Sequence, residues 1–221
     1  MQEISIIIAD DHPLFRSGVR SVLETVDNFR ILAETGNGFE ALKLIKELKP
    51  DVAVLDFQMP DLNGIEITEK LRAIKNPVKI ILLTMHDAKR IFFKALDAGV
   101  NGYLLKDDAV LEIVNAINAT QTGDEYISKS LVNLLVKKAT TYSADTNINK
   151  LLAQLTVAEN KILSLIADLK TTDEIADILF ISKRTIENHK VNISRKLRLE
   201  SSRELLRFVI QNSEYIKRIY S

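Results

Sequence analysis

The stretch VAVLDFQMPDLNG, residues 52–64, holds the signals that decide the fold of the first half of the chain. Val52–Leu55 is a continuous apolar run of strand length, and a turn-rich segment follows it. A run that is apolar at every position is typical of a strand buried on both faces, as in a parallel sheet covered by helices. Similar runs, each before a helix-periodic or turn-rich stretch, occupy residues 4–9, 30–33, 79–83 and 102–104. The pattern predicts a five-stranded, doubly wound parallel sheet of the α/β class.

Polar residues follow the predicted strands. Asp10 and Asp11 come after the first run, Asp56 after the third, Thr84 after the fourth and Lys106 after the fifth. Because the carboxyl ends of parallel strands meet at one edge of the sheet, we expect these side chains to lie together. Neighbouring carboxylates repel one another unless a hard cation lies among them, and Mg²⁺ suits a cluster without imidazole or thiolate. A lone Asp or Thr at a strand end is more often a turn or cap residue, but the whole set favours a site.

This set of side chains is suited to phosphoryl transfer. A carboxylate that faces Mg²⁺, an ammonium group and a hydroxyl can attack a phosphoryl group, because these partners stabilise the charge on its oxygens. Asp56 is therefore predicted to become an aspartyl phosphate. Pro60 and Gly64 are expected to stiffen the loop that follows, Gly64 by adopting a backbone angle that other residues avoid.

Four motifs together resemble the receiver domain of two-component response regulators: ADDHP at 9–13, DFQMPDLNG at 56–64, LTMH at 83–86 and GYLLK at 102–106. The resemblance covers residues 1–122 and implies a flavodoxin-like fold. It makes Asp56 the phosphoacceptor. In the same way it assigns metal binding to Asp10, Asp11, Asp56 and the backbone carbonyl of Gln58, sensing of the phosphoryl oxygens to Thr84 and Lys106, and a packing switch to Tyr103 with Thr84.

The second half has a different pattern. Residues 123–150 are predicted to form a linker, since they become polar and lose periodicity. Residues 151–221 show helical periodicity only, with four short helices and a polar cap residue before each: Thr156, Thr172, Ser182 and Ser201. The second and third helices are joined by residues 180–182, a length typical of a helix-turn-helix. We expect the last helix, around Leu205, Leu206, Val209 and Ile210, to provide a two-fold contact between copies of the chain.

The third of these helices has the features of a DNA-reading helix. Ile186, Ile193 and Leu197 recur at helical spacing and form an inward-facing stripe. Residues 183–198 contain six Lys and Arg residues against one Glu, a local charge of +5 that suits a polyanion. Arg, Asn, Glu and Val can contact base edges, whereas Lys neutralises phosphates. The predicted DNA contacts are Lys183, Arg184, Thr185, Glu187, Asn188, Lys190, Val191, Asn192, Arg195 and Lys196.

A second resemblance covers residues 151–214. The segments LTVAE at 155–159, EIA at 174–176, ISKRTIENH at 181–189 and NISRKL at 192–197 resemble the LuxR-type DNA-binding domain. With the receiver motifs, the whole chain resembles response regulators of the NarL/FixJ family. Ala158, Leu169 and Glu187 depart from the family's usual Arg, Gly and Lys.

The combined resemblance implies a transcription factor whose DNA binding is controlled by phosphorylation of Asp56. The implied partners are a histidine kinase, double-stranded promoter DNA and a second copy of the chain on phosphorylation or on DNA, with RNA polymerase as a further candidate. No enzyme activity is implied beyond self-phosphorylation from a phosphodonor and self-dephosphorylation at Asp56.

Composition narrows the class of protein. The hydrophobic fraction of 46% and the charged fraction of 27% are typical of globular proteins. Cys is absent, which excludes a disulfide framework and thiolate sites. No apolar run approaches the roughly 18 residues that a membrane span needs, and no basic region precedes an apolar stretch at residues 1–10. We therefore expect a cytoplasmic protein that does not contact the membrane.

Two alternative functions stay open at this point. A metal-dependent phosphatase would use the same aspartyl phosphate chemistry, although the chain offers neither a cap domain nor a second substrate-reading site. In the other alternative the C-terminal helices bind a protein instead of DNA. Glu187 and a net charge of only +3 for residues 151–221, from 12 Lys and Arg against 9 Asp and Glu, favour this alternative over the phosphatase.

Overall fold

The structure is a computed structural model of the chain, and it describes residues 3–85, 88–131, 148 and 151–220. The chain folds into two compact units, Met1–Leu131 and Val132–Ser221, and each is described by itself. The polar stretch 139–147 of the predicted linker lies outside the described residues.

The first unit is built on a parallel sheet with the strand order β2-β1-β3-β4-β5-β6. Its strands are β1 (Ile4–Ala9), β2 (Phe29–Thr35), β3 (Val52–Asp56), β4 (Lys79–Thr84), β5 (Gly102–Leu105) and β6 (Tyr126–Ile127). Every neighbouring pair is parallel. The predicted α/β class and the first five strands are thereby confirmed.

The sixth strand is a correction to the predicted five. It lies within residues 123–150, which the sequence assigned to a linker. The Tyr126 N–H donates to the Asn101 carbonyl at 3.0 Å, and the Ser128 N–H donates to the Tyr103 carbonyl at 2.9 Å. A strand of two residues is too short to show periodicity, so only pairing with β5 reveals it. Residues up to Leu131 belong to the first unit.

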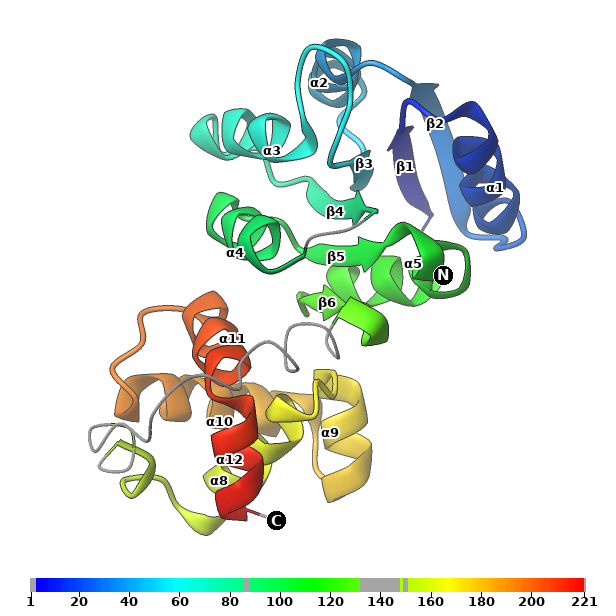
Figure 1. Cartoon of the computed structure of the whole chain (residues 1–221). Coiled ribbons are helices and arrows are strands. Elements are labelled where there is room, and N and C mark those ends of the chain that lie inside the picture. The colour runs from blue at the N-terminus through cyan, green and yellow to red at the C-terminus, as the bar shows by residue number, and fades with distance from the viewer. Residues whose placement is uncertain (1–2, 86–87, 132–147, 149–150, 221) are drawn as a thin grey trace. The chain divides into compact units, whose positions relative to one another are not determined.

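Helices cover both faces of this sheet (Figure 1). One face is covered by α1 (Pro13–Leu23) and α5 (Lys106–Gln121), which also pack against each other. The other face is covered by α2 (Gly38–Leu48), α3 (Gly64–Ala73) and α4 (Ala88–Ala98). Every residue of β3 is buried, and Ile6–Ala9 of β1 are fully buried. Burial on both faces is the reason that these strands are apolar at every position.

Gly64 is needed for space and not for an unusual backbone angle, so the sequence expectation is wrong in this respect. Among the described residues, only Gly99 and Gly123 of the glycines have positive φ, and the left-handed residue of this loop is Asp61 at φ 70°. A Cβ on Gly64 would lie 2.4 Å from Leu82 Cδ1 and 2.6 Å from the Asp56 carbonyl oxygen. The absence of a side chain lets α3 begin directly against the end of β3.

The second unit is helical, and a helix that was not predicted, α12, follows the four predicted ones. The helices are α8 (Val157–Ala167), α9 (Thr172–Leu179), α10 (Lys183–Lys196), α11 (Ser202–Gln211) and α12 (Ser213–Tyr220). Only Asn212 separates α11 from α12. Neither Gly nor Pro marks this boundary, and Asn212, a residue type that can end a helix, is the one sequence signal there.

Three of the four predicted cap residues are confirmed: Thr156, Ser182 and Ser201. The prediction of Thr172 is wrong by one position, since Thr171 caps α9. Thr171 has Glu174 three residues later, and the two form a reciprocal capping box in which the Thr171 N–H donates to Glu174 Oε2 at 2.9 Å. Thr172 has the apolar Ile175 in that place, so the box cannot form one residue later.

The core of the second unit uses the predicted stripe of α10. Ile186 and Ile193 are fully buried, and Leu197 is 3% exposed. The expectation that α11 offers an apolar contact to a second copy is wrong for its main residues, because Leu205, Val209 and Ile210 are also buried. Leu205 and Val209 pack in the same core as Ile216 of α12, the helix that the sequence analysis did not predict.

Glu159 is a buried carboxylate that joins two helices. It closes the capping box of α8 with Thr156 and accepts from the Lys196 ammonium of α10 at 2.6 Å. Burial raises the pKa of Glu159, but the hydrogen bonds from Lys196 and from the Thr156 backbone and side chain outweigh it, and the pKa lies below its usual 4.5.

We predict that Gly64→Ala lowers the free energy of unfolding by about 1–3 kcal/mol, because the added methyl group must displace Leu82 or the backbone of Asp56. Urea denaturation followed by circular dichroism measures the change. Gly18→Ala is the matched control, since a Cβ there meets nothing within 4 Å. In the interior of α1 it should stabilise the protein by about 0.5–1 kcal/mol. Equal effects of the two substitutions would contradict the argument from space.

The lowered pKa of Glu159 predicts a pH-dependent contribution to stability. A carboxylate with a lowered folded-state pKa stabilises the fold above its unfolded-state pKa, and this contribution is lost as the pH falls through the folded-state pKa. We expect Glu159→Gln to cost about 1–3 kcal/mol at neutral pH. The cost should shrink when urea denaturation of both proteins is repeated in acid. A cost that is the same at every pH would rule out an ionised Glu159 as its source.

Candidate functional site

The carboxyl edge of the sheet brings together the polar residues that the sequence placed after its strands. Asp10 follows β1, Asp56 ends β3, Thr84 ends β4 and Lys106 begins α5 directly after β5. All four are buried, with exposed fractions of 0%, 3%, 2% and 5% in that order. Buried polar side chains are uncommon unless they are paired, so their gathering at one edge marks a site.

The Lys106 ammonium joins the two buried carboxylates. Its Nζ atom lies 2.8 Å from Asp10 Oδ2 and 2.7 Å from Asp56 Oδ2. The Phe15 ring of α1 adds a third contact, with its centroid 4.9 Å from the same nitrogen. This is within the range of a cation–π interaction. Phe15 was not among the predicted site residues, because nothing in the sequence distinguishes it from an ordinary core residue.

Burial sets the protonation of this cluster. Burial raises the pKa of Asp56, and the charge of Asp10 raises it further. The hydrogen bond and charge of Lys106 and the hydrogen bond from the Gln58 backbone N–H lower it, but the net shift is upward. Burial lowers the pKa of Lys106, but its contacts with Asp10 and Asp56 outweigh this, and the net shift is also upward. Lys106 is therefore held as the cation, and Asp56 has a stronger hold on a proton than an exposed Asp.

Asp11 and His12 lie beside Asp10 and Asp56 at the same edge of the sheet, which we call the acidic edge. Atoms from Asp10, Asp11, His12 and Asp56 that can bind a metal all lie within 4.8 Å of one another. His12 Nδ1 lies 2.7 Å from Asp11 Oδ1, and the His12 N–H donates to Asp10 Oδ1 at 2.8 Å. His12 is not among the site residues predicted from the sequence, because a lone His shows none of the spacing typical of metal sites. The contact found for Gln58 is its N–H, which donates to Asp56 Oδ1 at 3.3 Å.

The donor set fits a divalent hard cation. Asp10, Asp11 and Asp56 carry three negative charges when ionised, and Lys106 carries one positive charge, so an excess of two negative charges remains. Asp10 Oδ2 is buried, and no described residue gives it a hydrogen bond of good geometry, although Lys106 lies near it. Carboxylate oxygens are the ligands that Mg²⁺ prefers.

Tyr103, the predicted switch residue, lies inside the unit. It is 3% exposed, and its ring packs edge to face against Phe92 with 5.3 Å between centroids and 75° between planes. Burial raises the pKa of the Tyr103 hydroxyl, and the Thr84 side chain opposes the rise. Tyr103 therefore links the edge that carries Thr84 to α4, which contains Phe92.

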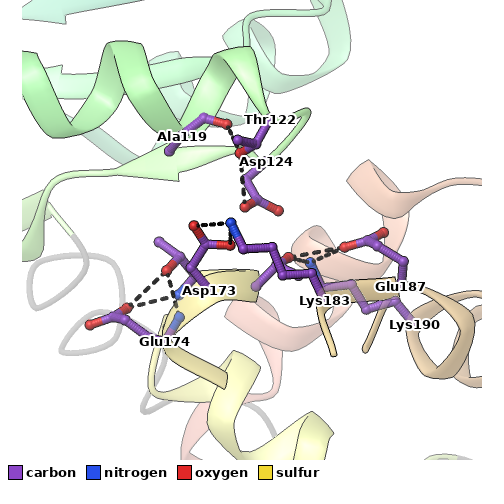
Figure 2. A network of polar contacts seen from close by, with 10 residues as sticks. Ala119, Thr122, Asp124, Asp173, Glu174, Lys183, Glu187 and Lys190 are labelled. Atoms are coloured by element: carbon purple, nitrogen blue, oxygen red, sulfur yellow. Dashed lines mark hydrogen bonds and ion pairs between the residues drawn. The ribbon is translucent and has the colours of Figure 1, made fainter. Parts of the chain in front are cut away.

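The predicted DNA contacts all lie on α10, but their surroundings differ. Those with largely exposed side chains are Lys183, Arg184, Glu187, Asn188, Val191 and Arg195, whereas Thr185, Lys190, Asn192 and Lys196 are partly buried. Several are bonded within the unit: Lys183 pairs with Asp173 at 2.6 Å and Lys196 with Glu159 at 2.6 Å. Figure 2 shows the pair of Lys183 and Asp173 beside that of Glu187 and Lys190. The helix is thus less cationic toward solvent than its sequence indicates.

Comparison with known proteins identifies the family. Residues 6–118 match the model of the response regulator receiver domain, and residues 153–209 match that of the bacterial regulatory proteins of the luxR family. The chain belongs to the response regulator family. The predicted resemblance is confirmed, and this response regulator acts as a transcription factor.

Relatives of this response regulator match over most of its length. It is 34% identical over 199 residues to the nitrate/nitrite response regulator protein homolog of Haemophilus influenzae, covering 90% of this chain and 92% of that protein. It is 33% identical over 211 residues to the oxygen regulatory protein NreC of Staphylococcus haemolyticus, covering 94% and 97%.

Solved structures give the same result. The response regulator RcsB of Salmonella typhimurium is 28% identical, with a TM-score of 0.58 over 95% of this chain and 98% of that one. A structure of two RcsB dimers bound to two parallel DNAs has 26% identity and a TM-score of 0.58, covering 95% and 99%. Among the described residues of the response regulator, no helix is both long and apolar enough to cross a membrane.

We predict that Asp56→Asn raises the melting temperature in buffer without divalent cations. The substitution leaves one buried carboxylate, Asp10, opposite one ammonium, Lys106, and so removes excess negative charge. A gain of about 1 kcal/mol or more is expected, and it should shrink when Mg²⁺ is added, since the cation neutralises the wild-type cluster. Thermal denaturation with and without Mg²⁺ measures both effects.

Asp51, which directly precedes β3 and so lies at the other end of that strand from Asp56, provides the control. Its Oδ2 accepts from the Ser5 N–H at 2.8 Å and from the Ser5 hydroxyl at 2.6 Å. Asp51→Ala should lower the melting temperature, and Mg²⁺ should not alter the change. A loss of stability in Asp56→Asn that is insensitive to Mg²⁺ would show that the carboxylate is not strained by its neighbours.

Proposed function

We propose that a partner histidine kinase phosphorylates Asp56, and that the phosphorylated receiver domain controls sequence-specific binding of α10 to promoter DNA. The observation that carries the proposal is the Lys106 ammonium held between Asp10 and Asp56 at the carboxyl edge of the sheet. A buried carboxylate with an ammonium group 2.7 Å from one oxygen can accept a phosphoryl group, because the negative charge on the phosphoryl oxygens then has a partner in place.

The reaction is a transfer of one phosphoryl group. An Asp56 oxygen attacks the phosphorus, the bond from phosphorus to the donor nitrogen or acyl oxygen breaks, and the donor leaves with that electron pair. Lys106 keeps its contact with Asp10 and donates to a phosphoryl oxygen, while the Thr84 hydroxyl donates to another. Attack of water on the same phosphorus later releases phosphate and restores Asp56. This is the only chemistry that we assign to the chain.

The acidic edge would hold a single Mg²⁺ ion. Asp10, Asp11, Asp56 and the backbone carbonyl of Gln58 are its proposed ligands. When bound, the ion neutralises charge on the phosphoryl oxygens. The chain itself keeps Asp10 in place, because the backbone N–H of His12 donates to Asp10 Oδ1 at 2.8 Å.

Thr84 and Tyr103 connect the phosphate to the surface of the unit. Movement of Thr84 toward a phosphoryl oxygen would alter the space beside the buried Tyr103 ring, which packs against Phe92 of α4. A surface that includes α4 would then change with phosphorylation and favour a second copy of the chain. RcsB is seen as dimers bound to DNA, which supports the same assembly on DNA here. Contact with RNA polymerase at the promoter is a further part of the proposal.

The experiment is selection from random duplex DNA by the full-length chain in Mg²⁺, with and without beryllofluoride as a mimic of the phosphate on Asp56. We expect enrichment of a two-fold motif mainly in the presence of the mimic. Asp56→Asn is the control. With or without beryllofluoride, it should give the result that the wild-type chain gives without beryllofluoride. Equal enrichment with and without the mimic would contradict control of DNA binding by the receiver. No enrichment in either condition would favour a protein as the ligand of the C-terminal domain.

A further inference from the structure

Three charged residues of α10 form one stripe that faces the first turn of α9. Lys183, Glu187 and Lys190 lie at positions i, i+4 and i+7 and therefore on one side of the helix. Lys183 Nζ lies 2.6 Å from Asp173 Oδ1, and Glu187 Oε1 accepts from the Thr172 hydroxyl at 2.9 Å (Figure 2). This stripe is therefore bonded to α9 within the same domain.

The carboxylate of Glu187 has two partners. Besides the Thr172 hydroxyl, its Oε1 accepts from the Lys190 ammonium at 3.0 Å, and Lys190 also donates to Thr172. Thr172 is 3% exposed and is the first residue of α9, so it is a fixed anchor. Both contacts of Glu187 are made by Oε1, so a rotation of the side chain that presents the carboxylate to a base edge would cost a hydrogen bond and an ion pair.

The neighbouring stripe of α10 has the chemistry for base reading. Arg184, Asn188, Val191 and Arg195 lie at i, i+4, i+7 and i+11, and all are exposed, Val191 to 61%. Arg and Asn form paired hydrogen bonds with guanine and adenine, and Val can contact the methyl group of thymine. The helix thus divides its outer surface into a stripe held by α9 and a stripe open to a ligand.

Lys183 and Lys190, which are paired with acidic side chains, gain less from a contact with a DNA phosphate than unpaired lysines do. A lysine that already faces a carboxylate must give up that contact before it can neutralise a phosphate and release a counterion from the DNA. The pair of Lys183 and Asp173 is itself weak, because both side chains are about half exposed, at 58% and 46%. Phosphate can therefore compete for Lys183, but with a lower net gain than for an unpaired lysine.

We propose that Asp173 and Glu187 are positioning residues that restrain Lys183 and Lys190 and so lower the affinity of α10 for DNA of any sequence. Base selection then rests on the open stripe of Arg184, Asn188 and Val191, and Glu187 does not read a base. The proposal deepens the proposed DNA-binding function and rests on it. Its specific claim is that two acidic side chains weaken non-specific binding more than specific binding.

The test compares Asp173→Asn and Glu187→Gln with the wild-type chain, all full length and with Mg²⁺ and beryllofluoride. Binding to the selected duplex and to a random-sequence duplex is measured over a series of salt concentrations. Each substitution should raise affinity for the random duplex by roughly threefold to tenfold at low salt and steepen the salt slope by about 0.9 for each lysine that gains a phosphate contact. The gain for the selected duplex should be smaller, and the selected motif should not change.

Two further variants separate this restraint from a general effect of charge. Asp177→Asn removes one charge from an exposed residue of the same helix that takes no part in these contacts, and it should leave the salt slope at the wild-type value. Lys183→Gln combined with Asp173→Asn should cancel the gain, because the lysine that was released is no longer there.

Asn188→Ala provides the reference for a base reader and should lose preference at one motif position. The same kind of change in Glu187→Gln would overturn the proposal, since it would show that Glu187 contacts a base. Wild-type salt slopes and random-duplex affinities in both Asp173→Asn and Glu187→Gln would overturn it as well. If wild-type protein bound neither duplex, the proposed DNA-binding function would fail, and this proposal with it.

Discussion

The Lys106 ammonium between Asp10 and Asp56 is the contact on which the arrangement of the first unit depends. The two carboxylates stand at the ends of the adjacent strands β1 and β3, and both are buried, so without a cation between them they would repel each other. Lys106 follows β5 directly, which means that the contact also fixes where α5 begins. The remaining site residues are placed by this geometry: Thr84 ends the strand between β3 and β5, and Phe15 of α1 packs against the ammonium.

The same contact prepares the site for a change of partner. An ammonium group has three N–H donors, and Lys106 directs two of its contacts to Asp10 and Asp56. A phosphoryl group on Asp56 would convert one carboxylate oxygen into the bridging oxygen of an acyl phosphate and add three phosphoryl oxygens, while the contact with Asp10 keeps Lys106 in place. The excess of carboxylates at this site lowers the stability of the fold by itself. The same excess of negative charge favours binding of a divalent cation, which in turn favours a phosphoryl group on Asp56.

Paired charges also organise the second unit, with a different result. Glu159 is buried, and its bond to Lys196 ties α8 to the end of α10, which is a structural role. Asp173 and Glu187 are more exposed, and their contacts join α9 to the start of α10 at Lys183 and to its middle at Glu187. Because weak exposed pairs can exchange partners, the contact with Asp173 orients Lys183 while leaving it at the surface. The segment of residues 183–198, with six cations and one carboxylate, thus presents less positive charge than its composition indicates.

The sequence by itself determined the alternation of strands and helices, the sheet edge where Asp10, Asp56, Thr84 and Lys106 meet, and the inward stripe of α10. Each of these follows from local spacing: the length of an apolar run, the residue that comes directly after it, or the helical repeat of apolar residues. Tertiary structure alone decided the features that join distant segments. These are the pairing of β6 with β5, the space that Gly64 leaves beside Leu82, the burial of Leu205 and Val209 beneath α12, and the partners of Lys183 and Glu187 on α9. Each requires two parts of the chain to meet, and no spacing along one segment encodes which side chain will lie opposite.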